Sequence, residues 1–526
     1  MSTHDDDAPG PPISVPDSGD TGEGGKLKMI VQLVKKSLGV KDIAAMRLSL
    51  PASLLEPIPN LEYWHYLDRP DFFAAINDHD DPFLRMLSVL RFTFTKDLKF
   101  VHGKVCKPYN SVLGEHFRAH WDIVPATFNP DASDDADQDD DQPSENASMK
   151  SGSGRSSRSG VSSTSASASA SKHKSTSTAA TSPNQTGQGD DLTAQISNLH
   201  LDASGTQGQG GVKTETEDGN GTVRVVYLTE QISHHPPVSA YYAACPSRHI
   251  EMNGIDQIAA KVSGTTLRVA PGEYNRGIYI HLTGGYGEGE RYHVTHPVAS
   301  VNGILRGSFY VTIGDSTVIS CEGGRPGHKF RTIIEYKEES WLGRAHYLLE
   351  GVIHTVFDSD EDGCAEWTKV KHVPQNRVVA VFDGTWRGLI RWKRVGTGSY
   401  PTERHDGVTR STSSSPNPSH ARLSTTSIGI ASKSKSDVRS FSGWGSGGAG
   451  VGGEEYSTLV DLSVLDVVPK VVRKLDRQGP RESRSLWKPV TSHLLRKEYS
   501  EATREKVTIE QRQRDDAAER KRKGVE

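Results

Sequence analysis

EQISHHPP, residues 230–237, is the stretch of this 526-residue chain that bears most directly on its fold. Neighbouring side chains on an extended strand point to opposite faces, so His234 and His235 would separate on a regular strand. Pro236 and Pro237 cannot donate ladder hydrogen bonds, which predicts a strand end or a turn directly after the histidines. Where the backbone bends, both imidazoles can donate to one dianionic phosphate. The pattern alone leaves a second interpretation open, in which one histidine packs and the other is exposed.

A second polar string, KPYNSVLGE, occupies residues 107–115. Lys107 offers a point charge and Asn110 offers an amide, and both groups suit a phosphate or a lipid headgroup. Gly114 permits a tight turn before the next strand. A plain surface loop that precedes a strand is the alternative interpretation of this string.

A third cluster stands near the end of the chain, where Lys506, Glu510 and Arg514 follow one another at intervals of four residues. This spacing places the three side chains on one face of a helix. The predicted helix is dense in Lys, Arg and Glu, so a salt-bridge ladder within the helix is the alternative to ligand binding.

The region from Val223 to Trp392 has the pattern of a β structure. Runs such as VRVVYL, GIYIHL and KFRTIIEY are short and rich in β-branched or aromatic residues, and turns with Gly, Asn, Asp or Pro separate many of them. Many antiparallel strands of this kind predict a barrel or a sandwich. A propeller is disfavoured because no repeat of roughly 20–50 residues is visible.

Low-complexity blocks interrupt the ordered segments. Hydrophobic residues make up only 34% of the chain, which also contains 51 Gly and 27 Pro. The blocks cannot bury enough apolar surface to offset the entropy of ordering, so they predict disorder. We therefore expect a disordered tail at residues 1–25 and disordered insertions at residues 129–220 and 396–455. The ordered parts are expected at residues 26–128, at residues 221–395 as the β region, and at residues 456–523 as a helical end.

Charge and cysteine content restrict the function class. The formal net charge of −4 disfavours nucleic-acid binding. Cys106, Cys245, Cys321 and Cys364 form no C-x-x-C pair, so reduced thiols in the cytosol are expected. The acidic N-terminus is unlike a secretory signal, and no apolar run approaches the ~20 residues of a membrane-spanning helix. We expect a cytoplasmic protein that contacts membranes peripherally.

Catalytic motifs are missing from the sequence. It contains no G-x-S-x-G elbow, no Walker lysine loop and no H-E-x-x-H. No further ligands at matching spacing complete a zinc site with the two histidines. Carboxylates such as Glu335 and Glu350 could act together in a barrel hydrolase, but nothing in the sequence selects a pair. We therefore expect no enzyme, no metal and no cofactor.

The three polar strings together resemble one known family. EQISHHPPVSA, residues 230–240, is similar to the E-Q-x-S-H-H-P-P signature of the oxysterol-binding-protein family. KPYNSVLGE resembles the family's K-P-x-N-P-x-L-G-E element, and GTWRG at 384–388 resembles a late strand. KVTIEQRQR at 506–514 resembles the final basic helix. The resemblance follows the family's order and spans roughly residues 27–523, apart from the two low-complexity blocks.

This resemblance implies a fold. The expected class is mainly β (α+β): a large, nearly closed antiparallel barrel around a hydrophobic tunnel. An N-terminal helix, predicted by the apolar spacing over residues 26–38, would act as a lid. A helical subdomain would follow the barrel at the C-terminus.

The resemblance also implies a ligand. His234 and His235, together with Arg514, would hold the 4-phosphate of phosphatidylinositol 4-phosphate. Because a phosphomonoester carries nearly two charges, its desolvation requires several donors at once. Acyl chains, or a sterol in an alternative complex, would fill the tunnel.

The remaining site residues are assigned in the same way. Lys107, Asn110 and Lys506 would engage the phosphate that bridges inositol to glycerol, or the inositol ring. Glu510 would orient the neighbouring basic groups. Ser111 departs from the family, because it stands where the family usually has proline.

The implied function is lipid transfer. The protein would exchange a sterol or phosphatidylserine for phosphatidylinositol 4-phosphate between membranes, acting as a monomer that touches membrane surfaces transiently. The alternative is a lipid-responsive regulator with slow transfer, in which the Ser/Thr-rich blocks recruit partners.

Overall fold

The computed structural model describes residues 13–14, 23–45, 48–102, 106–129, 221–303, 310–339, 345–357, 363–396, 399–401 and 456–525. All of them belong to one compact unit, which comprises residues 1–130 and 210–526. The second unit, residues 131–209, lies outside the described residues. The predicted insertions at 129–220 and 396–455 fall almost entirely outside as well, so their assignment stays a prediction.

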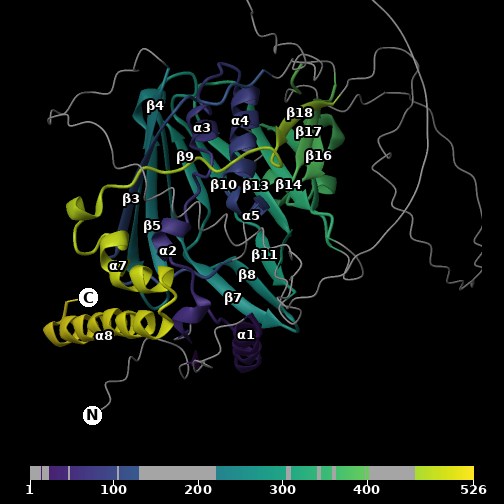
Figure 1. Ribbon diagram of the computed structural model, residues 1–526. Helices are drawn as coiled ribbons and strands as arrows, with labels where there is room; N and C mark the ends of the chain where they lie inside the picture. The colour runs from purple at the N-terminus through teal and green to yellow at the C-terminus, as the bar shows by residue number, and fades with distance from the viewer. Residues whose placement is uncertain are drawn as a thin grey trace, which may run out of the picture. The chain divides into compact units, whose positions relative to one another are not determined.

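Twelve strands form one large antiparallel sheet (Figure 1). In spatial order they are β3 His116–Ile123, β4 Val223–Ser233, β5 Val238–Cys245, β6 Ile250–Asp256, β9 Ile278–Leu282, β10 Glu290–Val294, β13 Ser316–Gly323, β14 Lys329–Tyr336, β15 Leu348–Val356, β16 Val378–Thr385, β17 Leu389–Arg394 and β18 Ser457–Asp461. In this order β3 and β18 are the end strands. The mainly β prediction is therefore confirmed, whereas the nearly closed barrel stays a prediction.

Two smaller sheets accompany the large one. β7 Ile258–Ser263, β8 Thr266–Pro271, β11 Val298–Asn302 and β12 Tyr310–Gly314 pair antiparallel in this order. β1 Ile13–Ser14 and β2 Leu48–Ser49 form a short parallel pair. The described 3-10 turns are η1 Ala52–Leu54, η3 Pro246–Arg248, η5 Gly363–Glu366, η6 Val370–His372, η7 Gln375–Arg377 and η9 Leu475–Arg477.

Strand β4 shows how the sequence pattern produces the sheet. Val223, Val225, Tyr227, Thr229 and Gln231 are buried, whereas most of the residues between them are exposed. This period of two gives the strand one core face and one solvent face.

Seven helices are described: α1 Glu23–Ser37, α2 Asn60–Tyr63, α3 Pro70–Ala74, α4 Pro82–Thr95, α5 Lys99–His102, α7 Ser483–Leu495 and α8 Tyr499–Lys523. Helix α4 begins at Pro82, after Asp81 caps it by accepting a hydrogen bond from the Phe83 backbone N–H at 2.8 Å. It packs on the large sheet (Figure 1). There the Phe83 ring lies against Phe330 of β14, with ring centroids 5.7 Å apart. Burial of one such aromatic side chain contributes about 2–3 kcal/mol.

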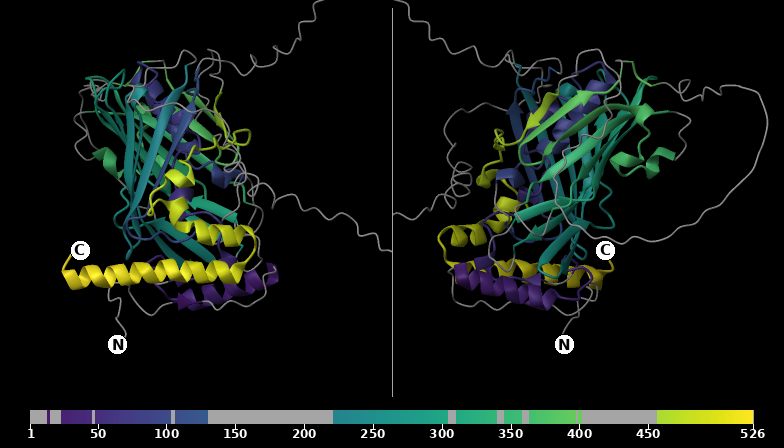
Figure 2. Two further views of the ribbon diagram at one scale, coloured as in Figure 1. Left: turned by 60° about the vertical axis from the view of Figure 1, so that its left-hand side comes forward. Right: turned by 90° about the vertical axis from the view of Figure 1, so that its right-hand side faces the viewer.

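Helix α1 corresponds to the helix predicted over residues 26–38. On one side, Met29 joins an apolar cluster that also contains Tyr109 and Trp487. On the other side, Val34 packs with Ala260 of β7. Helices α1 and α8 consequently lie next to each other at one end of the large sheet (Figure 2). The helix is confirmed, and its action as a lid stays a prediction. None of the described helices is long and apolar enough to cross a bilayer.

Candidate functional site

The two histidines lie in the connection between β4 and β5. Strand β4 ends at Ser233 and β5 begins at Val238, so the turn predicted after the histidines in fact includes them. The Ser233 hydroxyl stabilises this turn by donating to the Pro236 carbonyl at 2.8 Å, and the peptide bond before Pro236 is cis. The ring centroids of His234 and His235 lie 4.4 Å apart. The turn therefore keeps the two imidazoles together, as the phosphate interpretation requires.

The His234 side chain is held in its neutral form. Burial is the main cause that lowers its pKa to about 4, and the charges of His235 and Arg514 act in the same direction. A hydrogen bond between the ring and the Ser111 backbone opposes this shift only partly. At neutral pH this site thus presents an uncharged imidazole beside the Arg514 cation.

The KPYNSVLGE string forms the loop between α5 and β3 and joins the end of β4. The Gly114 N–H donates to the Gln231 carbonyl at 2.9 Å, and the Gln231 N–H donates to the Glu115 carbonyl at 2.8 Å. Gly114 has a φ of 74°, a left-handed conformation that favours glycine and makes the predicted tight turn. These two bonds place the loop directly beside the histidine turn.

Lys107 and Asn110 meet within this loop. The Lys107 ammonium donates to Asn110 Oδ1 at 2.6 Å and to the Pro108 carbonyl at 2.9 Å. Burial, followed by repulsion from Lys506, lowers the pKa of Lys107 to about 8, and Glu510 acts in the opposite direction. Helix α8 therefore brings two of its predicted site residues into the electrostatic field of Lys107.

The three residues of α8 differ in their surroundings. Lys506 is only 3% exposed, and its ammonium lies 2.6 Å from Glu510 Oε1. Arg514 is exposed and donates to the Gln511 side-chain oxygen at 2.8 and 3.1 Å. The predicted shared face is present, and the first step of the alternative salt-bridge ladder is present as well.

Glu115 connects the loop to the C-terminal helices. Its fully buried carboxylate accepts hydrogen bonds from the Val112 N–H at 3.0 Å, the Ser483 hydroxyl at 2.7 Å and the Trp487 indole at 3.0 Å. Burial raises the pKa of Glu115 to about 7, although these three bonds counteract the shift. The Tyr109 ring stacks obliquely on Trp487 with centroids 5.0 Å apart. Sequence reasoning missed Glu115 as a structural anchor, although the residue ends the KPYNSVLGE string.

The seven predicted residues therefore gather around the loop. Contacts or electrostatic effects link His234 to His235, His234 to Arg514, Lys107 to Asn110, Lys107 to Lys506 and Lys506 to Glu510. The seven residues include three cationic side chains, Lys107, Lys506 and Arg514, and one carboxylate, Glu510, so the set has an excess of positive charge. Such a set can hold an anionic group with several acceptor oxygens. Within the described ranges, no group of His, Cys, Asp and Glu could hold a metal ion.

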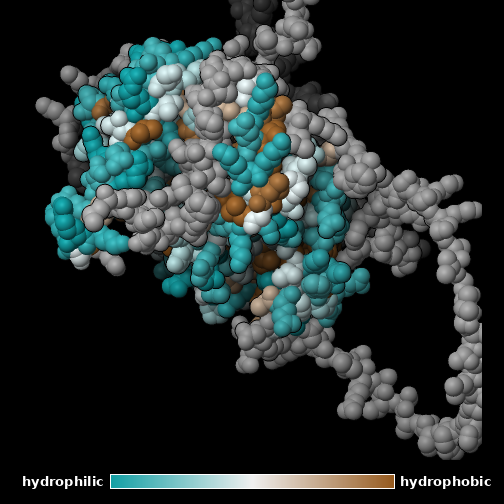
Figure 3. Space-filling model, turned by 90° about the horizontal axis from the view of Figure 1, so that it is seen from below, coloured by the Kyte–Doolittle hydropathy of each residue, from teal (hydrophilic) through white to brown (hydrophobic). Residues whose placement is uncertain are grey.

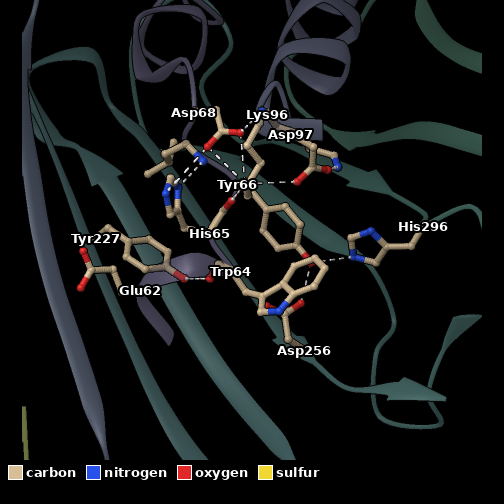
Figure 4. Close-up of polar contacts among 12 residues, drawn as sticks. Glu62, Trp64, His65, Tyr66, Asp68, Lys96, Asp97, Tyr227, Asp256 and His296 are labelled. Carbon is tan, nitrogen blue, oxygen red and sulfur yellow. Dashed lines mark hydrogen bonds and ion pairs between the residues drawn. The ribbon is translucent and has the colours of Figure 1, made fainter. Parts of the chain in front are cut away.

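A second polar cluster surrounds Tyr66 (Figure 4). The Tyr66 hydroxyl donates to Asp256 Oδ1 at 2.6 Å and lies 3.5 Å from His296 Nε2. Burial raises the pKa of Asp256 to about 7. Nearby, the Lys99 ammonium pairs with Asp68 at 3.1 Å. These contacts brace the segment around Tyr66 against β6. No motif predicted the cluster, because its members come from separate segments.

The chain is similar to known proteins along most of its length. The family model described as "Oxysterol-binding protein" matches residues 29–129 and 213–526. "Oxysterol-binding protein-like protein 1" of Schizosaccharomyces pombe is 37% identical over 524 residues, which cover 96% of this chain and 86% of that protein. "Oxysterol-binding protein-related protein 9" of Mus musculus is 23% identical over 97% of this chain, which spans only 48% of that relative's length.

A solved structure shows the same fold. The Osh1 ORD domain in complex with ergosterol superposes with a TM-score of 0.50 at 17% sequence identity, over 94% of this chain and 80% of that chain. At this identity the similarity concerns the fold alone.

Proposed function

This chain belongs to the oxysterol-binding protein family, a family of lipid-binding and lipid-transfer proteins, and we propose that it exchanges phosphatidylinositol 4-phosphate for a second lipid between membranes. The second lipid is a sterol or phosphatidylserine. Binding and release, without any bond breaking, carry this function.

The convergence of three distant segments supports the proposal most directly. The loop of Lys107, the turn of His234 and the helix of Arg514 share one site, and the bonds at Glu115 hold the loop to the C-terminal helices. A phosphomonoester leaves water only where several donors replace its hydration shell. The excess of cationic side chains supplies donors of this kind.

Each residue has a proposed role. His234, His235 and Arg514 hold the 4-phosphate. The bridging phosphate or the inositol ring is bound by Lys107, Asn110 and Lys506. For this binding, the two lysine ammonium groups exchange their present hydrogen-bond and ion-pair partners for the ligand. Glu510 keeps Lys506 in place before the ligand arrives, since the two side chains are already ion-paired at 2.6 Å.

The apolar part of the lipid requires an enclosed space. We propose that the large sheet curves into a nearly closed barrel whose tunnel holds the acyl chains or the sterol, with α1 as its lid. The contacts of α1 support this role, because its side chains pack both on the helices beside the site and on β7. The lid would then close next to the headgroup residues.

The end of the fold that carries α1 and α8 would meet the membrane. Lys28, Lys35 and Lys36 of α1 are exposed there, and the face seen from below mixes hydrophilic side chains with scattered apolar ones (Figure 3). Exposed lysines attract anionic headgroups, with about 1 kcal/mol for each lysine near the surface. We propose a monomer in the cytoplasm that makes such contacts transiently.

Transfer between liposomes tests the proposal. The purified protein is expected to move phosphatidylinositol 4-phosphate from donor to acceptor liposomes, and the double substitution His234→Ala with His235→Ala should abolish this movement. Unchanged transfer by the double variant would refute the site. Mass spectrometry of lipids that co-purify with the chain identifies the second lipid.

A further inference from the structure

Ser111 is a buried residue of the loop that also carries Lys107 and Asn110. It follows Asn110 directly in the loop, and its backbone forms a hydrogen bond with the His234 ring. The residue is only 5% exposed, and its hydroxyl has no hydrogen-bond partner within the described part of the chain. Burial of an unpaired hydroxyl destabilises a fold, so the position suggests a partner that arrives with a ligand.

The serine is a property of this chain rather than of the family element that the loop resembles. Where that element carries proline, KPYNSVLGE carries Ser111. Proline has neither a backbone N–H nor a side-chain donor, whereas serine supplies a hydroxyl. Serine at this position therefore has a backbone N–H and a hydroxyl that proline would lack, and the hydroxyl is the side-chain donor beside His234.

We propose that the Ser111 hydroxyl is a further phosphate ligand, which donates to the phosphomonoester held by His234 and His235. This inference rests on the proposed function of the site. A phosphomonoester offers three acceptor oxygens, and each can accept more than one hydrogen bond, so the phosphate can take a further donor besides those of His234, His235 and Arg514. Ser111 adds a short, rigidly placed donor on the loop side of the same group.

The proposal distinguishes between headgroups. Phosphatidylinositol has the bridging phosphate but no monoester, so Ser111 contributes to binding phosphatidylinositol 4-phosphate and not to binding phosphatidylinositol. Because hydrogen bonds to charged groups are the strong ones, loss of this donor should weaken affinity for the monoester about tenfold.

Two substitutions and one matched control form the experiment. Ser111→Ala removes the hydroxyl, and Ser111→Cys replaces it by a weak donor of similar volume. Ser53→Ala is the control, because Ser53 is also buried at 2% exposure with an unpartnered hydroxyl but lies in η1, outside the loop. We would measure the affinity of the full chain for liposomes that contain either phosphatidylinositol 4-phosphate or phosphatidylinositol. Inorganic phosphate is added as a competitor, and the Tm of each variant without lipid is recorded.

The expected result separates ligand binding from folding. Both Ser111 variants should bind phosphatidylinositol 4-phosphate about tenfold more weakly, bind phosphatidylinositol as the wild type does, and melt at the same or a higher temperature. Ser53→Ala should leave both affinities unchanged. Inorganic phosphate should displace the lipid less well from the Ser111 variants than from the wild type if the free ion also binds the Ser111 hydroxyl. Equal displacement would show that only the lipid phosphate binds this hydroxyl.

Two results would overturn the inference in different ways. If the wild type binds phosphatidylinositol 4-phosphate and the double histidine variant does not, but Ser111→Ala binds like the wild type, the role of Ser111 is wrong and the proposed function stands. If the wild type binds phosphatidylinositol 4-phosphate no better than phosphatidylinositol, the proposed function and the role of Ser111 fail together.

Discussion

Trp487 donates its indole N–H to the Glu115 carboxylate at 3.0 Å, and this bond fastens helix α7 to the loop that carries Lys107. Both side chains are fully buried. Helix α8 follows α7 directly, so the position of Lys506 relative to Lys107 depends on this attachment. The arrangement of Lys107 and Lys506 consequently depends on a contact between two segments that lie 372 residues apart in the sequence.

Removal of the Glu115 carboxylate should therefore destabilise the fold. Glu115→Ala leaves three donors without their acceptor, and each unpaired buried donor costs about 1–3 kcal/mol. We expect the free energy of unfolding to fall by at least about 3 kcal/mol in urea denaturation. Glu366→Ala, an exposed control in η5, should change it by less than about 0.5 kcal/mol. An equal effect at both positions would contradict the anchoring role.

The pH dependence of stability gives a second prediction for Glu115. Burial raises the pKa of Glu115 from 4.5 to about 7, so its stabilising contribution is present below pH 4.5 and is lost as the pH rises through 7. Glu115→Gln cannot ionise and keeps an oxygen for the Trp487 indole. We expect its stability relative to the wild type to rise by up to about 3 kcal/mol between pH 5 and 8. Parallel pH profiles of the two proteins in urea denaturation would contradict this interpretation.

The sequence predicts the three polar strings but not the contacts that hold them together. The sequence predicts each string because its residues are close together in the chain, as in EQISHHPP, KPYNSVLGE and the spacing from Lys506 to Arg514. The structure brings the three strings to one site. Glu115 was missed because its partner Ser483 lies 368 residues further along the chain. The same reason applies to the cluster around Tyr66, whose members share no spacing.

The β prediction succeeded because alternating burial has a local period, as in β4. Closure of a sheet has no such period, since it depends on how two distant edge strands approach each other. A nearly closed barrel accordingly rests on family resemblance, whereas the order of the strands rests on the structure.

Ligand binding should be coupled to proton uptake. Burial lowers the pKa of His234 to about 4 and that of Lys107 to about 8 in the free protein. A bound phosphate favours the protonated forms and raises both values, so binding takes up protons and affinity should increase as the pH falls from 8 to 7. Calorimetry in two buffers of different ionisation enthalpy measures this uptake. His234→Asn should reduce it, and proton release by the wild type would contradict the model.

The Glu510 carboxylate and the ligand phosphate should compete for the Lys506 ammonium, and a substitution at Glu510 tests this. Because Lys506 is buried and paired with it, Glu510→Gln leaves a buried ammonium without its counter-charge. We expect this variant to lose about 1–2 kcal/mol of stability without lipid, since the carboxylate itself is partly exposed. The ligand phosphate should restore the missing charge, so phosphatidylinositol 4-phosphate should raise the Tm of the variant more than that of the wild type. Glu519→Gln, which pairs with exposed Lys523, is the matched control. A smaller shift in the Glu510 variant would show that the ligand phosphate does not replace this carboxylate as the counter-charge of Lys506.

The exposed lysines of α1 predict how transfer depends on membrane charge. Lys28 and Lys35 lie seven residues apart on α1 and are exposed, whereas Met29 and Val34 anchor the helix to the fold. Lys28→Glu with Lys35→Glu should therefore leave stability almost unchanged but slow transfer from anionic liposomes. With about 1 kcal/mol per lysine and reversal of both charges, a reduction of more than tenfold is expected at low salt. The difference should shrink at high ionic strength, where exposed charges are screened, and it should vanish on neutral liposomes. Equal slowing on neutral and anionic liposomes would instead show that these residues act through the movement of α1 and not through membrane charge.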